Sequence, residues 1–169
     1  KLTSVKPFPP KKVRPCVFEY IYFARPDSLL DNKTAYEHRK NIGVELAKEN
    51  DVDADIVVPV PDSGNAAALG FAQYLKMNYE HGLIRNHYVG RTFIEPSQKI
   101  RSLGVKLKLN ANKTTIKDKK IILIDDSLVR GTTSHKIVKM LYDAGAKEVH
   151  VKIACPEIRY PDFYGVDTP

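Results

Sequence analysis

The sequence predicts an α/β domain built on a parallel sheet, and three segments support this prediction. Residues 121–124 are four consecutive branched apolar residues, which is typical of a buried strand. Residues 56–60 form a second apolar run, and apolar and polar residues alternate over residues 149–153. Helical patterns follow the first two of these strands. Strand–helix–strand repeats of this kind favour parallel strands joined by right-handed crossovers.

The first predicted helix begins at Thr34 and runs to about Glu49. Thr34 and Glu37 have the spacing of a capping box, in which each side chain accepts a hydrogen bond from the other residue's backbone N–H. The strand at residues 56–60 contains Pro59, which is unusual in a central strand because proline donates no ladder hydrogen bond. Residues 61–64 then predict a turn, and an Ala-rich helix is expected from Ala66 to Leu75.

A third strand is expected near residues 80–84, followed by a loop over residues 86–112. A loop of this length is unusual in a compact domain and is typically a lid over a site or a disordered segment. Glu95 is the only acidic residue of this loop, in which basic residues are in excess. The basic residues are Arg91, Lys99, Arg101, Lys106 and Lys108.

The strand at residues 121–124 ends in two adjacent carboxylates, Asp125 and Asp126. A glycine and three hydroxyl residues follow at 131–134, and a helix comes next with apolar residues at i, i+3, i+4 and i+7. Those apolar residues are Ile137, Met140, Leu141 and Ala144, and Gly145 is expected to end the helix. Ligands of open α/β sheets bind at the carboxyl ends of strands, so the sequence predicts a binding site here.

A phosphorylated sugar fits the chemistry of this site. The N-terminus of a helix attracts a phosphate through its free N–H groups and its dipole. Residues 132–134 add hydroxyl donors, and Gly131 lets the backbone approach the ligand closely. Asp125 and Asp126 would repel the phosphate unless they face a ribose diol or a hydrated Mg²⁺. An acid pair that only caps the next helix would not explain the Arg-Gly-Thr-Thr sequence beside it.

Composition narrows the class of protein. A chain of 169 residues supports one domain with a sizeable core, and no run of 18 apolar residues predicts a membrane span. Two cysteines without repeated spacing favour a reducing, cytoplasmic setting. Residues 1–15 are basic and Pro-rich, so we expect a linker there and the domain over residues 16–169. The net charge of +7 indicates an anionic partner, but base-reading aromatic motifs are missing, so a small polyphosphate is favoured over nucleic acid.

Residues 119–134 resemble the 5-phosphoribosyl-1-pyrophosphate (PRPP) signature of type I phosphoribosyltransferases. Four further blocks are similar to the amidophosphoribosyltransferase family in particular, and the resemblance covers nearly all of the chain beyond its first dozen residues. These blocks are Cys16–Ser28, Val58–Gly64, Tyr88–Ile94 and Tyr164–Asp167. The resemblance implies a parallel-sheet type I phosphoribosyltransferase fold with a flexible lid loop, formed by residues 86–112.

The resemblance also implies a role for individual positions. The expected PRPP-binding residues are Asp62, Ser63, Gly64, Arg85, Tyr88, Asp125, Asp126, Ser127, Arg130, Gly131, Thr132, Thr133 and Ser134. The expected catalytic residues are Arg91, Lys108, Asp125 and Asp126, and the expected Mg²⁺ ligands are Ser63, Asp125 and Asp126. Closure of the lid would exclude water, which competes with the nucleophile for the reactive sugar.

Cys16 matches the first of four cysteines that hold an iron–sulfur cluster in a subset of the family. The second would fall within residues 160–164, where Asp162 stands instead, and two more would lie beyond Pro169. Because a cluster needs thiolate ligands, we expect no iron–sulfur cluster. We expect Cys16 to be a small buried residue instead.

The implied reaction is displacement of pyrophosphate from PRPP by ammonia that is released from glutamine, which belongs to de novo purine synthesis. The chain begins at Lys1 without the family's N-terminal cysteine nucleophile and stops at Pro169. We therefore expect the transferase core without the glutaminase domain of the parent protein and without the family's C-terminal part. A homo-oligomer is expected, and neither nucleic acid nor a membrane. Two alternatives stay open: a salvage phosphoribosyltransferase for a nucleobase, and a non-catalytic PRPP-sensing regulatory protein.

Overall fold

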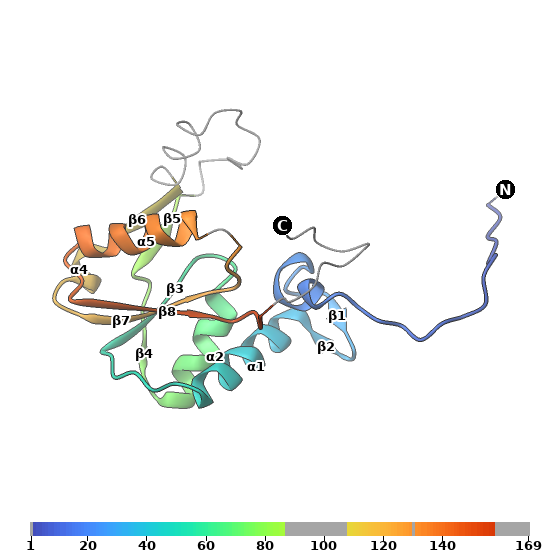
Figure 1. The fold of residues 1–169 in the computed structure, drawn as a ribbon, viewed down its shortest axis with the longest axis horizontal. Coiled ribbons are helices and arrows are strands. Elements are labelled where there is room, and N and C mark those ends of the chain that lie inside the picture. Colours follow the sequence, from blue (N-terminus) through green and yellow to red (C-terminus); the bar gives the residue numbers. More distant parts are fainter. Residues whose placement is uncertain (1, 87–107, 130, 158–169) are drawn as a thin grey trace.

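A four-stranded parallel sheet with the strand order β4–β3–β7–β8 runs through the middle of the protein (Figure 1). The computed structural model describes residues 2–86, 108–129 and 131–157. The strands of the sheet are β3 (Ile56–Pro59), β4 (Asn78–Tyr79), β7 (Lys120–Asp125) and β8 (Glu148–Ile153). All three strand pairs are parallel. The predicted α/β class and its parallel sheet are therefore confirmed.

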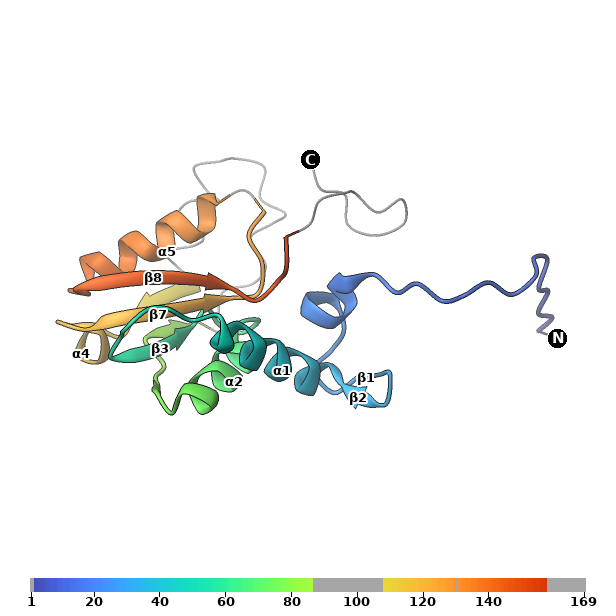
Figure 2. The same ribbon diagram turned by 60° about the horizontal axis from the view of Figure 1, so that its bottom comes forward.

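Helices cover both faces of this sheet. α1 (Ala35–Lys48) and α2 (Asn65–Leu75) lie on one face, and α5 (Thr132–Asp143) lies on the other (Figure 2). Successive residues of a strand point to opposite faces. Val57 and Ile122 accordingly pack in the core on the α1 and α2 side, whereas Val58 and Leu123 pack in the core with α5. The central strands are apolar throughout because both of their faces are buried.

The connections place a topological switch point between β3 and β7. The chain passes from β3 through α2 to β4 on one face, and from β7 through α5 to β8 on the other face. The crossovers therefore leave in opposite directions from two neighbouring strands. In open α/β sheets, ligands bind outside the carboxyl ends of the strands at such a point. The carboxyl ends of β3 and β7 are where the sequence predicts its two binding turns.

Local sequence signals set the helix boundaries. The N–H of Glu37 donates to Thr34 Oγ1 at 3.1 Å, and the N–H of Thr34 donates to Glu37 Oε2 at 2.8 Å, which completes the predicted capping box. At the end of α5, Gly145 has φ of 97°. Its N–H donates to Tyr142 O, and the N–H of Ala146 donates to Leu141 O. These bonds form a Schellman motif, which confirms that Gly145 closes the helix.

Pro59 is accommodated because the sheet is narrower at its carboxyl end. Strand β4 pairs only with Ile56 and Val57 of β3, whereas β7 pairs with β3 as far as Pro59, opposite Ile124. Pro59 therefore has a neighbouring strand on one side only. Its nitrogen faces the open side, because the next N–H, of Val60, donates to β7, and a missing N–H costs little there.

Two sequence expectations between α2 and β7 are wrong in their boundaries. No single strand spans residues 80–84: β4 ends at Tyr79, and β5 (Leu83–Arg85) belongs to a separate sheet. Strand β5 pairs antiparallel with β6 (Leu109–Ala111), which lies inside the segment that was expected to be loop. The turn at residues 80–82, in which the N–H of Gly82 donates to Glu80 O, takes the chain out of the parallel sheet. A short helix, α4 (Lys113–Ile116), then leads to β7.

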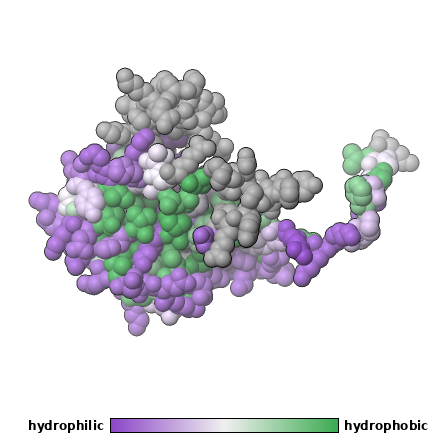
Figure 3. All heavy atoms as spheres, viewed as in Figure 1, coloured by the Kyte–Doolittle hydropathy of each residue, from purple (hydrophilic) through white to green (hydrophobic). Residues whose placement is uncertain are grey.

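The N-terminal part is small and lies beside α1. It consists of the π-helix η1 (Glu19–Phe23) and a hairpin of β1 (Leu29–Leu30) with β2 (Lys33–Thr34). Residues 2–15 form neither helix nor strand and extend away from the sheet (Figure 1). On the face drawn in Figure 3, apolar side chains gather over the middle of the molecule and polar ones surround them. Within the described residues, every helix is too short or too polar to cross a membrane.

Candidate functional site

The two carboxylates at the end of β7 differ in exposure and in hydrogen bonding. Asp126 is buried, and Asp125 is half-buried. The N–H of Asp126 donates to Asp125 Oδ1 at 2.9 Å, and the hydroxyl of Ser127 donates to Asp126 Oδ1. The end of β8 holds the backbone of both, because the N–H groups of Ala154 and Cys155 donate to the carbonyls of Asp125 and Asp126. The backbone of the acid pair is therefore held by the residues that follow β8.

The electrostatics of this pair favour a cationic partner. Burial, followed by the charge of Asp126, raises the pKa of Asp125 to about 7, and the hydrogen bond from the Asp126 N–H acts in the opposite direction. A carboxyl group with this pKa is partly protonated at neutral pH. A nearby cation would favour the ionised form and release the proton. Two carboxylates and a neighbouring hydroxyl are oxygen donors of the kind that Mg²⁺ prefers.

The turn at residues 61–64 is locked against the end of β7. The N–H of Val60 donates to Ile124 O at 2.8 Å, and the N–H of Gly64 donates to Val60 O at 2.9 Å. A Cβ on Gly64 would lie 2.5 Å from Ile124 O, which is closer than any side chain can approach. Glycine at this position therefore lets the turn lie directly on β7. The result brings Ser63 and Asp126 to the same hollow.

The start of α5 offers unsatisfied backbone donors. Gly131 is the N-cap residue, with φ of 69°, and no side chain of the described residues caps the helix. The first N–H groups of a helix have no partner within it, so those at 132–134 are available to an anion. Thr132 and Thr133 are exposed, and Ser134 is half-buried. A Cβ built on Gly131 meets no heavy atom within 4 Å, so there is open space beside the backbone where a ligand could approach.

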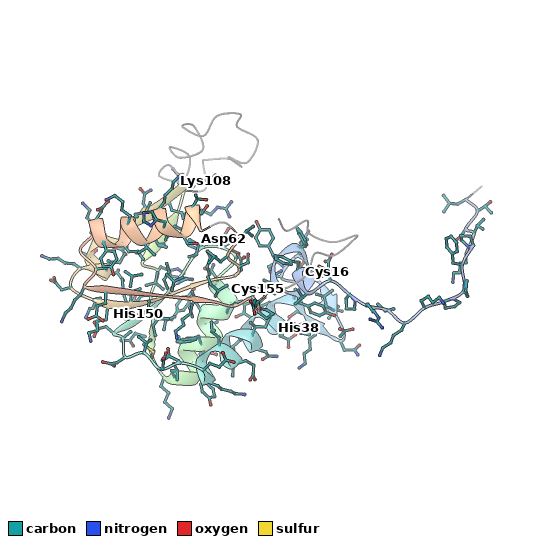
Figure 4. All side chains as sticks on the ribbon, viewed as in Figure 1. Cys16, His38, Asp62, Lys108, His150 and Cys155 are labelled. Atoms are coloured by element: carbon teal, nitrogen blue, oxygen red, sulfur yellow. The ribbon has the colours of Figure 1, made fainter. Side chains whose placement is uncertain are left out.

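Asp62, which precedes Ser63 in the turn after β3, forms an ion pair with Arg85. Arg85 Nη1 donates to Asp62 Oδ2, and both side chains are about half exposed. Arg85 ends β5, so the pair joins the β5–β6 hairpin to the turn after β3. Lys108 lies at the base of the same hairpin, where its carbonyl accepts the N–H of Asn86 at 2.7 Å. Figure 4 shows Asp62 and Lys108 on the same side of the molecule, with His150 elsewhere on β8.

A small hollow, with room for about one water molecule, adjoins Asp126, and it is lined by a charged residue that the sequence analysis missed. Its lining residues are Ile21, Arg39, Ile42, Ser63, Ala67, Asp126 and Ala154. Arg39 is buried in α1, and its guanidinium donates to Tyr20 O at 2.9 Å and to Ala24 O at 2.8 Å. A signal was present in the sequence, because Arg39 stands in a stripe of small residues with helical spacing. The buried residues of that stripe are Ala35, Arg39, Gly43 and Ala47.

Five of the expected site residues come together at the switch point, and three others lie outside the described residues. Tyr88, Arg91 and Arg130 lie outside the described residues, as do residues 87–107 of the expected lid. Asp62 and Arg85, which were both expected to bind substrate, form an ion pair with each other. The residues that meet around the carboxyl ends of β3 and β7 are Ser63, Gly64, Asp125, Asp126 and Ser127.

The cysteines and histidines form no second site within the described residues. Cys16 and Cys155 are both free and half-buried. The region where a second cluster ligand was sought, residues 160–164, lies outside the described residues. Across residues 2–86, 108–129 and 131–157, no three His, Cys, Asp or Glu side chains are grouped so that they could hold a metal ion by themselves. A metal at the acid pair would need further ligands from water or substrate.

The chain is similar to amidophosphoribosyltransferases from several kingdoms, although no family model matches it. It is 60% identical over 164 residues to the enzyme of Rhizobium etli, which covers 97% of this chain and 33% of the relative. Over 152 residues it is 57% identical to the enzyme of Methanocaldococcus jannaschii, covering 90% of this chain and 32% of the relative. A chloroplastic relative from Glycine max is 56% identical over 91% of this chain and 27% of its own length. The chain thus spans about a third of the length of these relatives.

Solved structures agree with the sequence relatives. The chain is 54% identical, with a TM-score of 0.79, to glutamine PRPP amidotransferase from B. subtilis in complex with ADP and GMP; the match covers 90% of this chain and 34% of that one. A structure described as the allosteric regulatory enzyme of purine biosynthesis matches equally, at 54% identity and a TM-score of 0.79, over 90% of this chain and 33% of that one. The type I phosphoribosyltransferase fold expected from the sequence is confirmed by this likeness.

Proposed function

We propose that this chain forms the PRPP-binding catalytic core of an amidophosphoribosyltransferase. It matches about a third of the length of such enzymes. The reaction is attack of ammonia on C1 of PRPP, which breaks the bond to pyrophosphate and gives 5-phosphoribosylamine. One observation carries the proposal from the structure. Ser63 and Asp126 come from the carboxyl ends of two neighbouring strands and face one hollow at the switch point of the sheet.

The 5-phosphate is assigned to the start of α5. Its donors would be the N–H groups and hydroxyls of residues 132–134, with Ser127 and Arg130 beside them. The helix dipole and the uncapped N–H groups favour a dianion at this position. The open space beside Gly131 lets the phosphate reach the backbone without meeting a side chain.

The ribose is assigned to Asp125 and Asp126, which would accept hydrogen bonds from its hydroxyls and fix the orientation of C1. Together with Ser63, the two carboxylates also fit a Mg²⁺ ion, because Mg²⁺ prefers oxygen ligands. The pKa of Asp125 is raised, and a cation beside it would favour its ionised form. A bound Mg²⁺ would neutralise charge on the leaving pyrophosphate. The hydrogen bonds from Ala154 and Cys155 to the backbone carbonyls of Asp125 and Asp126 hold both residues at the end of β7.

The pyrophosphate is assigned to the turn at residues 61–64 and to the basic residues around it. Arg85 is already beside this turn, and Tyr88, Arg91 and Lys108 are proposed to complete the surroundings of the leaving group. Basic groups that stabilise the departing pyrophosphate lower the barrier to substitution at C1. No general base is required, since ammonia is nucleophilic in its neutral form.

The further partners and the compartment are proposed from the same relatives. Ammonia would come from a glutaminase domain of the parent protein, as the name of the amidotransferase relative suggests. A homo-oligomer is proposed from the family resemblance alone. The cytoplasm is the proposed compartment, whereas the plant relatives carry the word chloroplastic in their names. The relatives reported above are all amidophosphoribosyltransferases, which argues against the nucleobase salvage and regulatory alternatives.

Pyrophosphate release tests the proposed function. The purified chain is incubated with PRPP and Mg²⁺, and either ammonia or glutamine is added. Release is expected with ammonia, rising with pH as ammonium deprotonates, and none is expected with glutamine. A variant with both Asp125→Asn and Asp126→Asn, folded by circular dichroism, should release no pyrophosphate. Full activity of that variant would overturn the assignment of the acid pair, and release with a nucleobase in place of ammonia would favour the salvage alternative.

A further inference from the structure

The two buried charged side chains among the described residues have opposite charges and face the same hollow. Arg39 is 8% exposed and Asp126 is 7% exposed. They come from α1 and from the end of β7, and both line the small hollow beside the acid pair. A charge that is removed from water is costly unless an opposite charge or strong hydrogen bonds compensate it. The presence of both charges at one place therefore calls for a physical explanation.

The hydrogen bonds of Arg39 do not account for its charge. Two of the five guanidinium N–H groups donate to the carbonyls of Tyr20 and Ala24, which fastens η1 to α1. A neutral side chain with the same donors could do this at a lower desolvation cost. Burial lowers the pKa of Arg39, and the negative charge of Asp126 acts in the opposite direction. Asp126 accepts a hydrogen bond from the hydroxyl of Ser127 and forms no ion pair with any described residue.

We propose that Arg39 is a positioning residue of the PRPP site, which compensates the charge of Asp126 across the hollow and thereby holds this carboxylate where the substrate needs it. The proposal rests on the proposed function for the role of Asp126. Ser63, in the turn after β3, lines the same hollow. A movement of the Asp126 carboxylate would therefore change the distance between Asp126 and Ser63. The same guanidinium donates to the carbonyls of Tyr20 and Ala24, so Arg39 also connects the N-terminal part of the chain to the site.

Stability measurements on four proteins test the charge compensation without any substrate. They are the wild type, Arg39→Met, Asp126→Asn and the variant with both changes. Arg39→Met keeps the volume but leaves Asp126 as an uncompensated buried charge, so its Tm should fall by roughly 5 °C or more. Adding Asp126→Asn to Arg39→Met should then recover part of this loss. A further loss, equal to that of Asp126→Asn alone, would refute the compensation.

The same comparison remains decisive if Arg39→Met does not fold. Folding of the double variant would support the compensation, because removal of both charges would have rescued the protein. Failure of both variants to fold would show that only the bonds to Tyr20 and Ala24 matter, and would refute it.

Binding of Mg²⁺–PRPP, measured by calorimetry, tests the positioning role. Arg39→Lys loses the planar guanidinium that reaches two carbonyls, but it keeps the positive charge. Because the charge is kept, the affinity of this variant for Mg²⁺–PRPP should stay within about threefold of the wild type. Arg39→Met should bind about tenfold more weakly or worse, because small displacements of a positioned group have large effects. Arg25→Met, which removes an exposed arginine paired with Asp27, is the matched control and should bind as the wild type does.

The outcomes separate this inference from the proposed function. Equal affinity of the lysine and methionine variants would refute the positioning role of the charge. A wild-type chain that does not bind Mg²⁺–PRPP would overturn the proposed function, and the Tm comparison would still decide whether Arg39 compensates Asp126.

Discussion

Replacing Gly131 by alanine separates a backbone cost from a clash with the ligand. Gly131 has φ of 69°, and a Cβ there meets no atom within 4 Å. The free protein should therefore lose only the cost of a left-handed L-residue, about 1–2 kcal/mol, which corresponds to roughly 2–8 °C in Tm. In the proposed complex the new methyl group occupies space beside the phosphate. The affinity for PRPP should then fall by roughly tenfold or more, because donors to the anion are lost.

Gly145→Ala is the matched control for this experiment. Gly145 lies at the other end of the same helix with φ of 97°, and a Cβ there would be 3.4 Å from a side-chain atom of Lys117. Both variants should lose similar stability in thermal denaturation, whereas only Gly131→Ala should lose affinity in a calorimetric titration with PRPP and Mg²⁺. If both variants bind PRPP as tightly as the wild type, the phosphate does not lie at the start of α5. A sulfate ion found at this turn in a crystal would support the assignment.

Three further predictions address other parts of the protein. Because the native pKa of Asp125 is raised from 3.8 to about 7, the native state holds a proton that the unfolded chain has released, so unliganded stability should fall as pH rises across this range; urea titrations should show a flatter profile for Asp125→Asn. Thr34→Ala removes half of the capping box of α1 and should cost about 1 kcal/mol in urea denaturation, and a change below a few tenths would contradict the capping role. Arg85→Gln breaks a half-exposed ion pair with Asp62, so stability should change by less than about 1 kcal/mol, while pyrophosphate release from PRPP should decrease; unchanged release would remove Arg85 from the site.

The sequence predicted the elements that depend on local signals. These are the capping box at Thr34, the apolar run that became β7 and the glycine that ends α5. Each of them depends only on residues that are close together in the sequence. Such signals can be recognised without any knowledge of the tertiary fold. The acid pair was predicted for the same reason, because it follows a buried strand directly and precedes a glycine and a helix.

The contacts between distant segments could not be predicted in this way. Strand β6 pairs with β5 across a segment of more than twenty residues, and neither strand is long enough to show a periodic pattern. The ion pair between Asp62 and Arg85 joins residues that are 23 positions apart, and nothing local in the sequence indicates it. Arg39 lay in a helix that was correctly predicted. Its burial, however, depends on η1, whose carbonyls it binds.

The electrostatics of the free site provide a physical reason for it to bind a charged ligand. At neutral pH, Asp125 is near its pKa, and Asp126 is compensated across a hollow by Arg39 rather than by direct contact. Neither carboxylate is therefore fully stabilised by the protein alone. A ligand that brings hydroxyl donors and a cation would complete the surroundings of both, while its phosphate would meet the uncapped start of α5. Binding at this point should thus stabilise the ionised form of Asp125, and the switch between β3 and β7 is where the fold brings these requirements together.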